Sequence, residues 1–333
     1  MSEDMRDSVF ISIVILNYNG KGFLEPCLNS VLNSDYDNFE VVLVDNASTD
    51  GSVELIESIF GANRKIRIIR NKENTFFTGG NNIGIREAKG EYIIVLNNDT
   101  EVDPKWLREI ALVMGDEEIG AAQPKIRIFN QNPAKIDYAG ATIDKYGFAK
   151  GFGSGEIDNG QFDDVGDIFY AGGTAMILKR KVLDEVGIFD ERFGMHWEDA
   201  DLSWRIRLKG YRIVLIPKAL VYHKGSLSMS KFTANAKVAW YVRKNRIAGL
   251  LKNYSAISLI KYLPVLILIY LLNFVREFFT VGTKVALSSF WAIVWNISEL
   301  PYILAQRRIV QNKIRSISDQ EIISHMQKGC VVF

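Results

Sequence analysis

Continuously apolar segments alternate with amphipathic segments along the first third of the chain. The apolar segments predict buried strands at Phe10–Leu16, Glu40–Val44, Ile66–Ile69 and Glu91–Leu96. The intervening segments predict helices at Lys21–Asn33, Gly51–Phe60 with Asp50 as its N-cap, Asn82–Ala88 and Pro104–Met114. Strands that are apolar throughout and separated by helices indicate a mostly parallel sheet with both faces covered. We therefore expect an α/β fold.

Two further apolar segments follow in the last third of the chain. Tyr262–Val275 is uncharged and extends back to Asn253 with one interruption at Lys261, and Val285–Ser298 extends to Leu304 if Glu299 is tolerated. A bilayer core requires about 20 apolar residues per helix, so both segments are borderline spans. Basic residues flank the outer ends of this predicted helical hairpin: Arg243, Lys244, Arg246, Arg307, Arg308, Lys313 and Arg315. Such flanks are typical of a hairpin with cytoplasmic ends or of an amphipathic pair in the cytoplasmic interface.

A buried helical pair inside a soluble domain is the third interpretation of these segments, because short apolar runs are often core helices. We favour membrane association through residues about 253–304 and leave open whether the hairpin spans the bilayer. The length of 333 residues suits two domains. We expect a catalytic domain at residues 1–235, with halves at about 1–100 and 101–235, followed by a basic helical region at residues 236–333.

Composition excludes several classes of protein. Hydrophobic residues make up 48% and charged residues 24% of the chain, which excludes wholesale disorder. Two cysteines and three histidines exclude a disulfide framework and a structural zinc site. Acidic residues at Glu3, Asp4 and Asp7 are unlike the basic start of a signal peptide, so we expect a cytoplasmic location.

The net charge of +1 conceals a strong asymmetry. Residues 1–201 carry 20 basic and 35 acidic side chains, whereas no acidic residue and 14 basic ones lie between Asp201 and Glu277. This asymmetry predicts an anionic partner for the second half of the chain. The adjacent apolar segments favour a membrane over nucleic acid as that partner.

Polar sequences follow three of the predicted strands. They are Asn17-Tyr18-Asn19-Gly20, Asp45-Asn46-Ala47-Ser48-Thr49-Asp50-Gly51 and Asn97-Asn98-Asp99-Thr100-Glu101. Ligands of open parallel sheets bind beyond the carboxyl ends of the strands, so we expect these residues to line a site. Neither a G-x-G-x-x-G nor a P-loop motif is present, which disfavours dinucleotide and P-loop nucleotide binding. Asp99 suits Mg²⁺ or Mn²⁺ shared with phosphate oxygens, or equally the cap of the following helix.

A second polar cluster lies at His196–Arg205 and contains three carboxylates, Glu198, Asp199 and Asp201. Their mutual repulsion raises pKa values, which is typical of a general base but is also tolerated at a helix N-terminus. His223 follows a strand predicted to begin at Tyr211–Ile216. A lone histidine in this position is more often structural than a ligand.

The ordered motifs of this chain resemble those of the family-2 inverting glycosyltransferases. They are NYNG, VLVDNASTDGS, TGGNNIGIREAKGEYIIVLNNDTEVDP, FYAGGTAMILKR, HWEDADLSWRIRLKGYRI and VYHKG, and they cover about residues 9–250. Within the family, the chain is similar to the rhamnosyltransferase-like branch, which builds cell-surface polysaccharides. The resemblance implies a GT-A fold that binds a nucleotide-diphosphate sugar, with the donor-binding half first and the acceptor-binding half second.

The resemblance also implies roles for donor-site residues. Asp45 recognises a pyrimidine base, and Asn17 and Asn19 line the same pocket. Asn81 positions the donor near its phosphates. Asn98 belongs to Asn97-Asn98-Asp99, which stands where the family has an Asp-x-Asp motif, with Asn in place of the usual first Asp.

For metal binding and catalysis, the resemblance implies that Asp99 and His223 hold a divalent cation, Mg²⁺ or Mn²⁺. Asp199 matches the base of the family. Glu198 and Asp201 would shape its electric field and hold the acceptor or a loop, and two glycines would let the backbone approach the sugar or acceptor: Gly172 and Gly173.

The expected activity is inverting transfer of a single sugar, rhamnose or similar, from a UDP- or dTDP-sugar to a glycan or polyprenyl-linked acceptor. We expect this reaction at the cytoplasmic face of the cell membrane. Three alternatives remain: a processive synthase, a dolichol-phosphate-type transferase and a catalytically silent nucleotide-sugar-binding membrane protein. A Q-x-x-R-W motif would indicate the first, but Gln306-Arg307-Arg308 is not followed by Trp. The presence of Asp199 disfavours the silent protein.

Overall fold

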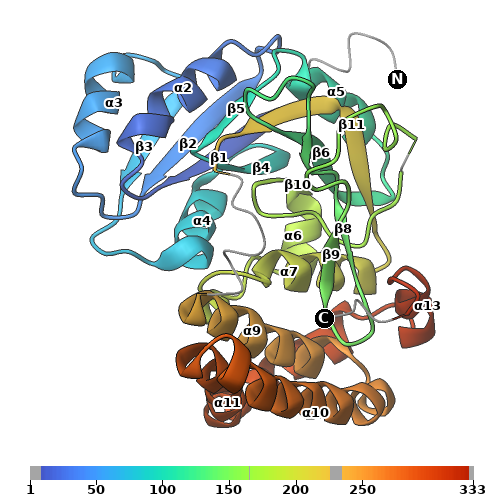
Figure 1. Cartoon of the computed structure of the whole chain (residues 1–333). Coiled ribbons are helices and arrows are strands. Elements are labelled where there is room, and N and C mark those ends of the chain that lie inside the picture. Colours follow the sequence, from blue (N-terminus) through green and yellow to red (C-terminus); the bar gives the residue numbers. More distant parts are fainter. Residues whose placement is uncertain (1–8, 165, 226–234, 330–333) are drawn as a thin grey trace.

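A mixed β-sheet forms the centre of the computed structural model, which describes residues 9–164, 166–225 and 235–329 (Figure 1). The acidic N-terminal residues and Cys330 lie outside this part of the chain. The order of the strands in the nine-stranded sheet is β3-β2-β1-β4-β10-β6-β11-β5, and β7 pairs with β6. Its strands are β1 (Ile11–Asn17), β2 (Phe39–Asp45), β3 (Ile66–Arg70), β4 (Tyr92–Asn97), β5 (Thr100–Val102), β6 (Ile119–Ile128), β7 (Ile136–Tyr138), β10 (Ala175–Lys179) and β11 (Arg212–His223), and a separate hairpin is formed by β8 (Ala141–Ile143) and β9 (Ala149–Gly151).

The first half of the sheet is parallel, as predicted. Strands β3, β2, β1 and β4 run in one direction, and their register places Asn17 beside Asp45 and Leu16 beside Asn97. The second half is mixed, because β10 runs antiparallel to both β4 and β6, whereas β11 is parallel to β6. The α/β prediction is confirmed, and the carboxyl ends of β1, β2 and β4 meet at one edge.

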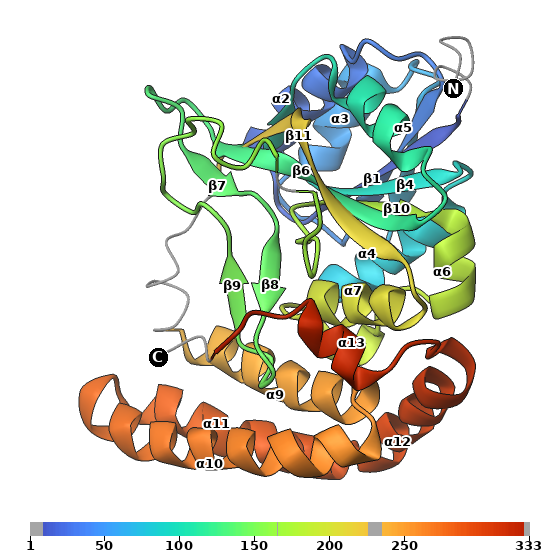
Figure 2. The same ribbon diagram turned by 90° about the vertical axis from the view of Figure 1, so that its right-hand side faces the viewer.

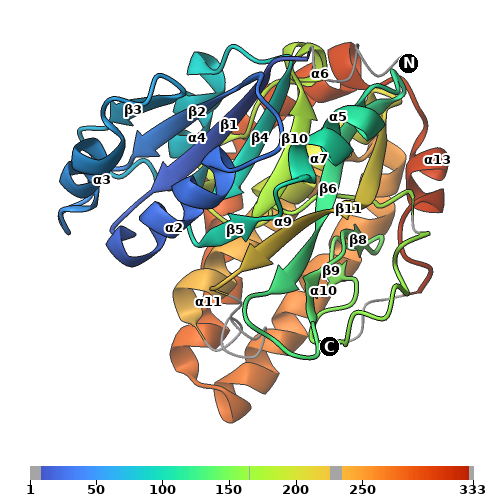
Figure 3. The ribbon, with the colours of Figure 1, turned by 90° about the horizontal axis from the view of Figure 1, so that it is seen from above.

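Helices cover both faces of the sheet, and each face has its own cluster of buried apolar side chains (Figure 3). The helices are α2 (Lys21–Leu32), α3 (Ser52–Phe60), α4 (Phe76–Glu87), α5 (Trp106–Met114), α6 (Arg180–Val186), α7 (Glu198–Leu208), α9 (Ala236–Asn253), α10 (Ala256–Thr280), α11 (Thr283–Ser298), α12 (Leu300–Ile309) and α13 (Asp319–Ser324), with a 3₁₀ turn η1 (Glu191–Phe193) and a π turn η2 (Val310–Ile314).

Helix α4 begins six residues before its predicted start at Asn82. The glycines in this added part of the helix and after it bring the helix close to the sheet. A Cβ atom at Gly80 would collide with Leu16, and one at Gly84 would collide with Val14. Close helix–strand packing, rather than a turn, therefore explains this glycine-rich sequence.

The C-terminal helices form a layer beneath α7 (Figures 1 and 2). Helix α9 lies between α7 and the α10–α11 pair, and one cluster of buried residues crosses the predicted domain boundary near residue 235. The predicted hairpin is present, with a turn at residues 281–282. Within the described part of the chain, α10 alone is long and apolar enough to cross a membrane.

Candidate active site

Three polar side chains converge where β1, β2 and β4 end. The buried Asn17 amide donates hydrogen bonds to Asp45 Oδ1 at 3.0 Å and to Ser52 Oγ at 2.9 Å. Its Oδ1 accepts a bond of 2.9 Å from the Asn98 amide, and Ser48 N donates to Asp45 Oδ2 at 3.1 Å. The parallel register of these strands thus brings together Asn17, Asp45 and Asn98, as the sequence predicted.

Asn19 ties the loops after β1 and β2 to one another. Its backbone N–H donates to Ser48 Oγ at 2.9 Å, and its Oδ1 accepts from Thr49 N at 2.8 Å. Asn19 has a left-handed backbone with φ 54°, which asparagine adopts more readily than most residues. Its main role in the structure is to fix the loop that borders the Asn17–Asp45 cluster.

The N-terminal turn of α4 closes another side of the site. Asn81 is buried, its amide donates to Phe77 O at 2.9 Å, and its Oδ1 has no hydrogen-bond partner within the described residues. Phe76 has φ 60° although it is aromatic and exposed. Strained backbone of this kind concentrates at functional sites. Both features are consistent with a ligand-binding role for this turn.

Asp99 and His223 lie next to each other at the carboxyl ends of β4 and β11. His223 Nε2 is 3.3 Å from Asp99 Oδ2, and His223 Nδ1 is 2.7 Å from Asp137 Oδ2. Burial lowers the pKa of His223, but hydrogen bonds with Asp137 and Asp99 outweigh it and raise the pKa to about 9. Asp137 is a partner that the sequence did not reveal, because it stands on the three-residue strand β7 outside the quoted motifs.

The Asp99–His223 pair fits a divalent cation. Asp99 Oδ1 is buried and has no hydrogen-bond partner among the described residues. A carboxylate on the far ring nitrogen, as Asp137 provides, is the usual support of a metal-binding histidine. No group of three or more His, Cys, Asp or Glu side chains in the described chain is arranged to hold a metal ion. The pair therefore suits a cation that takes its other ligands from phosphate oxygens and water.

The two glycines after residue 171 connect the site to the acidic cluster. Gly172 N donates to Gln123 Oε1 at 2.5 Å, and Gly173 N donates to Asp199 Oδ2 at 3.1 Å. A Cβ atom at Gly173 would lie 2.9 Å from the Phe77 ring, so only glycine lets this backbone pass between α4 and α7. Within the protein, Asp199 is one of the contacts of this close approach, and the predicted approach of the backbone to the sugar or acceptor stays a prediction.

Glu198 and Asp199 begin α7, directly after His196 and Trp197, which both have left-handed backbones. Burial raises the pKa of both carboxyl groups. For Asp199 this effect is partly offset by hydrogen bonds from Ala200 N and Gly173 N. Glu198 also experiences the neighbouring charge of Asp199, its Oε2 lacks a partner within the described residues, and its pKa is raised well above the usual range. The surroundings of Glu198 thus favour its protonated form, whereas two backbone N–H groups favour the ionised form of Asp199.

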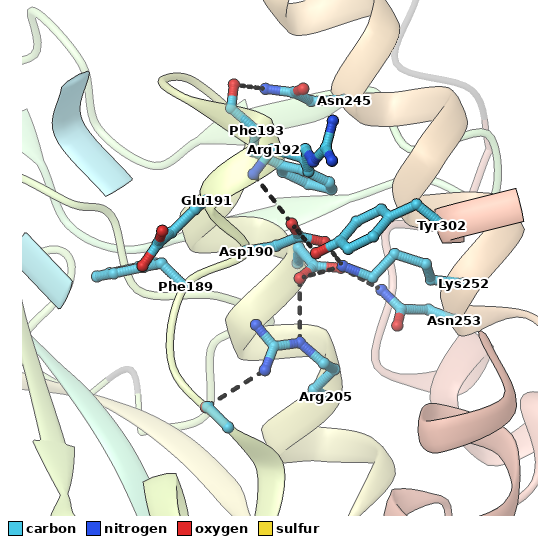
Figure 4. A network of polar contacts seen from close by, with 12 residues as sticks. Phe189, Asp190, Glu191, Arg192, Phe193, Arg205, Asn245, Lys252, Asn253 and Tyr302 are labelled. Carbon is cyan, nitrogen blue, oxygen red and sulfur yellow. Dashed lines mark hydrogen bonds and ion pairs between the residues drawn. The ribbon is translucent and has the colours of Figure 1, made fainter. Parts of the chain in front are cut away.

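Asp201 is separated from the other two carboxylates. It is completely buried, and it accepts from Arg205 Nε at 3.0 Å, Lys252 Nζ at 3.1 Å and Asn253 Nδ2 at 3.1 Å. Lys252 Nζ also lies 2.6 Å from Asp190 Oδ2. Figure 4 shows this contact. We call Asp190, Asp201, Arg205 and Lys252 the α7–α9 charge cluster. The oxygens of Asp201 are engaged by side chains of α7 and α9, and its predicted role in holding the acceptor or a loop stays a prediction.

Two aromatic residues near the glycines were also missed by the sequence analysis. Tyr138 lies against Gly172, and its hydroxyl is buried. Burial, together with the neighbouring Tyr170 and Asp199, raises the pKa of Tyr138. Tyr138 ends the three-residue strand β7 and Tyr170 forms an isolated bridge, so neither has a periodic signal in the sequence and only the three-dimensional structure brings them to the site.

Comparison with known proteins identifies the family. Residues 12–187, more than half of the chain, match the family model described as Glycosyl transferase family 2. The O-antigen biosynthesis protein RfbC of Myxococcus xanthus is 28% identical over 232 residues, covering 67% of this chain and 18% of RfbC. Poly-beta-1,6-N-acetyl-D-glucosamine synthase of Staphylococcus aureus is 27% identical over 220 residues, covering 64% of this chain and 49% of the synthase. The chain therefore spans less than half of the length of these relatives.

Solved structures share the fold. GalNAc-T7 with UDP, GalNAc and Mn²⁺ superposes with a TM-score of 0.61 at 17% identity, covering 95% of this chain and 60% of that one. The mannosyltransferase PcManGT from Pyrobaculum calidifontis, in complex with GDP-Man and Mn²⁺, has a TM-score of 0.52 at 15% identity and covers 96% of this chain and 85% of that one. The predicted GT-A fold is confirmed, whereas the rhamnosyltransferase-like branch stays a prediction. By the extent of its match to the family model, the chain belongs to glycosyl transferase family 2.

Proposed function

We propose that the protein transfers a single sugar from a pyrimidine nucleotide diphosphate to a lipid-linked glycan acceptor, with inversion at the anomeric carbon. The activity serves the synthesis of a polysaccharide or other glycan. Rhamnose is the donor sugar that the resemblance favours. Asp45 and Asn17 would contact the base, and Asn81 and Asn98 would lie near the diphosphate.

One observation carries this proposal. Asn97 N donates to Thr174 O at 2.9 Å, and the adjacent Gly173 N donates to Asp199 Oδ2 at 3.1 Å. A single short turn therefore joins the polar end of β4 to the carboxylate at the start of α7. A donor held at the first and an acceptor hydroxyl held at the second would have their reacting atoms close together, which is the main requirement of a direct displacement.

The chemistry follows from the different environments of the two carboxylates. Glu198, whose pKa burial and the neighbouring Asp199 raise well above the usual range, is assigned the role of holding a proton, and Asp199, held by two backbone N–H groups, is assigned the role of accepting the proton of the acceptor hydroxyl. The hydroxyl oxygen forms a bond to the anomeric carbon as the bond from that carbon to the diphosphate breaks. A divalent cation held by Asp99 and His223 would supply positive charge for the departing diphosphate. Gly173 holds Asp199 in place throughout.

Calorimetric titration tests the proposal. UDP, dTDP, GDP and NADH are each titrated with and without Mn²⁺ into the wild-type protein and into Asp99→Ala. We expect one pyrimidine diphosphate to bind in a Mn²⁺-dependent manner, and we expect at least a tenfold loss of affinity in Asp99→Ala because Asp99 supplies the only carboxylate of the pair. Binding of NADH, or of no nucleotide, would contradict the proposal.

The nucleotide cluster can be tested through a glycine beside it. A Cβ atom at Gly20 would collide with the Asn98 amide and lie 2.5 Å from Asn17 Oδ1, so Gly20→Ala must displace both side chains. We expect about tenfold weaker binding of the nucleotide diphosphate, measured by the same calorimetry. The control is Gly22→Ala, because no atom lies within 4 Å of a Cβ atom there. Equal affinities of the two variants would contradict the proposed role of the cluster.

The raised pKa of Asp199 predicts a pH dependence. Burial raises this pKa more than hydrogen bonds from Ala200 N and Gly173 N lower it. The base works only when ionised, so the single-turnover rate should rise tenfold per pH unit at low pH and level off once the pH exceeds that pKa. The midpoint should lie above the ordinary pKa of aspartate, 3.8. A rate that stays constant down to pH 4 would contradict this assignment.

We also propose that the α10–α11 pair attaches the protein to the cytoplasmic face of a membrane without crossing it. The inner face of α10 is buried at four-residue spacing, at Ser258, Tyr262, Leu266 and Tyr270. Its outer face exposes large apolar side chains, among them Ile257 at 81% and Phe279 at 79%. This pattern fits an interfacial helix. In vesicle flotation, failure of the full-length protein to float with anionic vesicles would contradict the proposal.

A further inference from the structure

An apolar groove runs between α9 and α11. Its volume is about 530 Å³, which lies within the range of about 300–1,000 Å³ that is usual for small-molecule sites. Three tryptophans, one serine and two lysines are among the side chains that line it: Trp240, Trp291, Trp295, Ser288, Lys237 and Lys284. We call this feature the tryptophan groove.

The tryptophan groove is continuous with the exposed apolar surface of α11. Trp291 lines the groove and is 53% exposed, and its ring lies 5.3 Å from that of Phe290, which is 52% exposed on the same surface. Under the proposed membrane attachment, lipid chains could therefore enter the groove from the bilayer without crossing water. Amphipathic tryptophan rings are typical of such a boundary.

Two lysines give the groove a positive charge. Lys237 and Lys284 are both exposed, and neither forms an ion pair within the described residues. No acidic residue occurs between Asp201 and Glu277, so the sequence leaves Lys237 without nearby carboxylates along the chain. An apolar groove with two free ammonium groups complements a molecule that has a hydrocarbon chain and a phosphate.

A chain of aromatic contacts leads from the groove to the catalytic carboxylate. Trp240 stacks edge-on against Tyr241, with ring centroids 4.8 Å apart, and Tyr241 is 6.3 Å from Phe76. Lys237 Nζ lies 6.0 Å from the centre of the Phe76 ring. The next residue, Phe77, contacts the position of Gly173, which holds Asp199. The strained turn at Phe76 thus lies between the groove and the proposed base.

We infer that the tryptophan groove binds the isoprenoid chain of a lipid-phosphate acceptor, with Lys237 and Lys284 on its phosphate or diphosphate. This inference rests on the proposed function and adds to it the class and location of the acceptor lipid. The hydrocarbon enters from the membrane side, the charged head lies at the lysines, and the glycan passes over Phe76 towards Asp199. Charge complementarity and continuity with the membrane-facing surface identify this occupant.

Farnesyl phosphate is a suitable soluble probe, because it combines a short isoprenoid chain with a phosphate. Three of the six tryptophans line the groove, so its binding is followed by intrinsic tryptophan emission of the full-length protein. We expect saturable binding of farnesyl phosphate and weaker binding of farnesol and of inorganic phosphate. Lys237→Gln/Lys284→Gln should weaken binding of farnesyl phosphate about tenfold or more.

The control is Lys261→Gln/Lys313→Gln, which removes the same charge from exposed positions outside the groove. Equal affinities of the two double variants would overturn the inference. The inference would also be overturned if phosphatidylglycerol vesicles competed for the groove as strongly as farnesyl phosphate binds to it. The groove would then be a general site for anionic lipids. UDP binding is measured on the same samples, so that loss of the nucleotide site, which would contradict the proposed function, is distinguished from failure of the groove.

Discussion

Replacing Asp199 by asparagine is expected to lower the rate of sugar transfer by about 10²- to 10⁴-fold, the usual contribution of a general base. The asparagine oxygen can still accept the hydrogen bond from Gly173 N, so the turn that joins the base to the donor site keeps its geometry. The variant loses the capacity to take a proton and, because its NH₂ group cannot accept, the hydrogen bond from Ala200 N. Affinity for the nucleotide diphosphate should therefore be unchanged, because Asp199 is not among the groups around Asp45 and Asn17.

Single-turnover rates and calorimetric affinities of Asp199→Asn would separate these two effects. Glu198→Gln is the matched comparison, since glutamine resembles the protonated form that burial favours at this position. We expect a clearly smaller loss of rate for Glu198→Gln than for Asp199→Asn. The reverse order would assign the base to Glu198.

Replacing Lys252 by methionine is expected to destabilise the protein by about 3–5 kcal/mol, the usual cost of removing one partner from a buried ion pair. Lys252 is buried and lies 2.6 Å from Asp190 Oδ2 and 3.1 Å from Asp201 Oδ2. Methionine retains the apolar stem of the lysine side chain. It removes the ammonium group whose positive charge both carboxylates share. Arg205 would still face Asp201, whereas Asp190 would depend on neutral donors such as the Tyr302 hydroxyl.

Urea-induced unfolding measures this loss. Lys313→Met is the control. Lys313 is exposed in the same C-terminal region, and its ammonium group forms no hydrogen bond or ion pair within the described residues. A change of less than about 1 kcal/mol for Lys252→Met would mean that the α7–α9 charge cluster does not stabilise the fold.

The sequence predicted the polar cluster at the ends of β1, β2 and β4 better than the contacts made by β7. Strands β1, β2 and β4 are uniformly apolar and end in polar residues, so their parallel pairing alone brings Asn17, Asp45 and Asn98 together. The contacts of Asp137 and Tyr138 could not be predicted in the same way. Both stand on a short strand whose position depends on pairing with β6, a long-range contact that leaves no periodic pattern in the sequence.

Two features could not be read from the local sequence alone. The helix at Asn82–Ala88 was predicted to begin six residues too late, and the small size of the glycines in its first turns serves helix–sheet contact at Leu16 and Val14. Asp201 was grouped with the catalytic residues because it stands two positions after Asp199. On a helix, however, side chains two residues apart point in different directions, and Asp201 faces α9 instead.

The contact between Trp197 and Gly249 limits how this enzyme can diversify. Trp197 immediately precedes Glu198 and Asp199, its indole donates to Gly147 O at 3.1 Å, and a Cβ atom at Gly249 of α9 would collide with its ring. A C-terminal region exchanged from a related enzyme would therefore need a glycine at this position and a lysine equivalent to Lys252. Helices α7 and α9 are therefore expected to be inherited as a matched pair, because their contact adjoins the proposed base and a mismatch there would displace the start of α7.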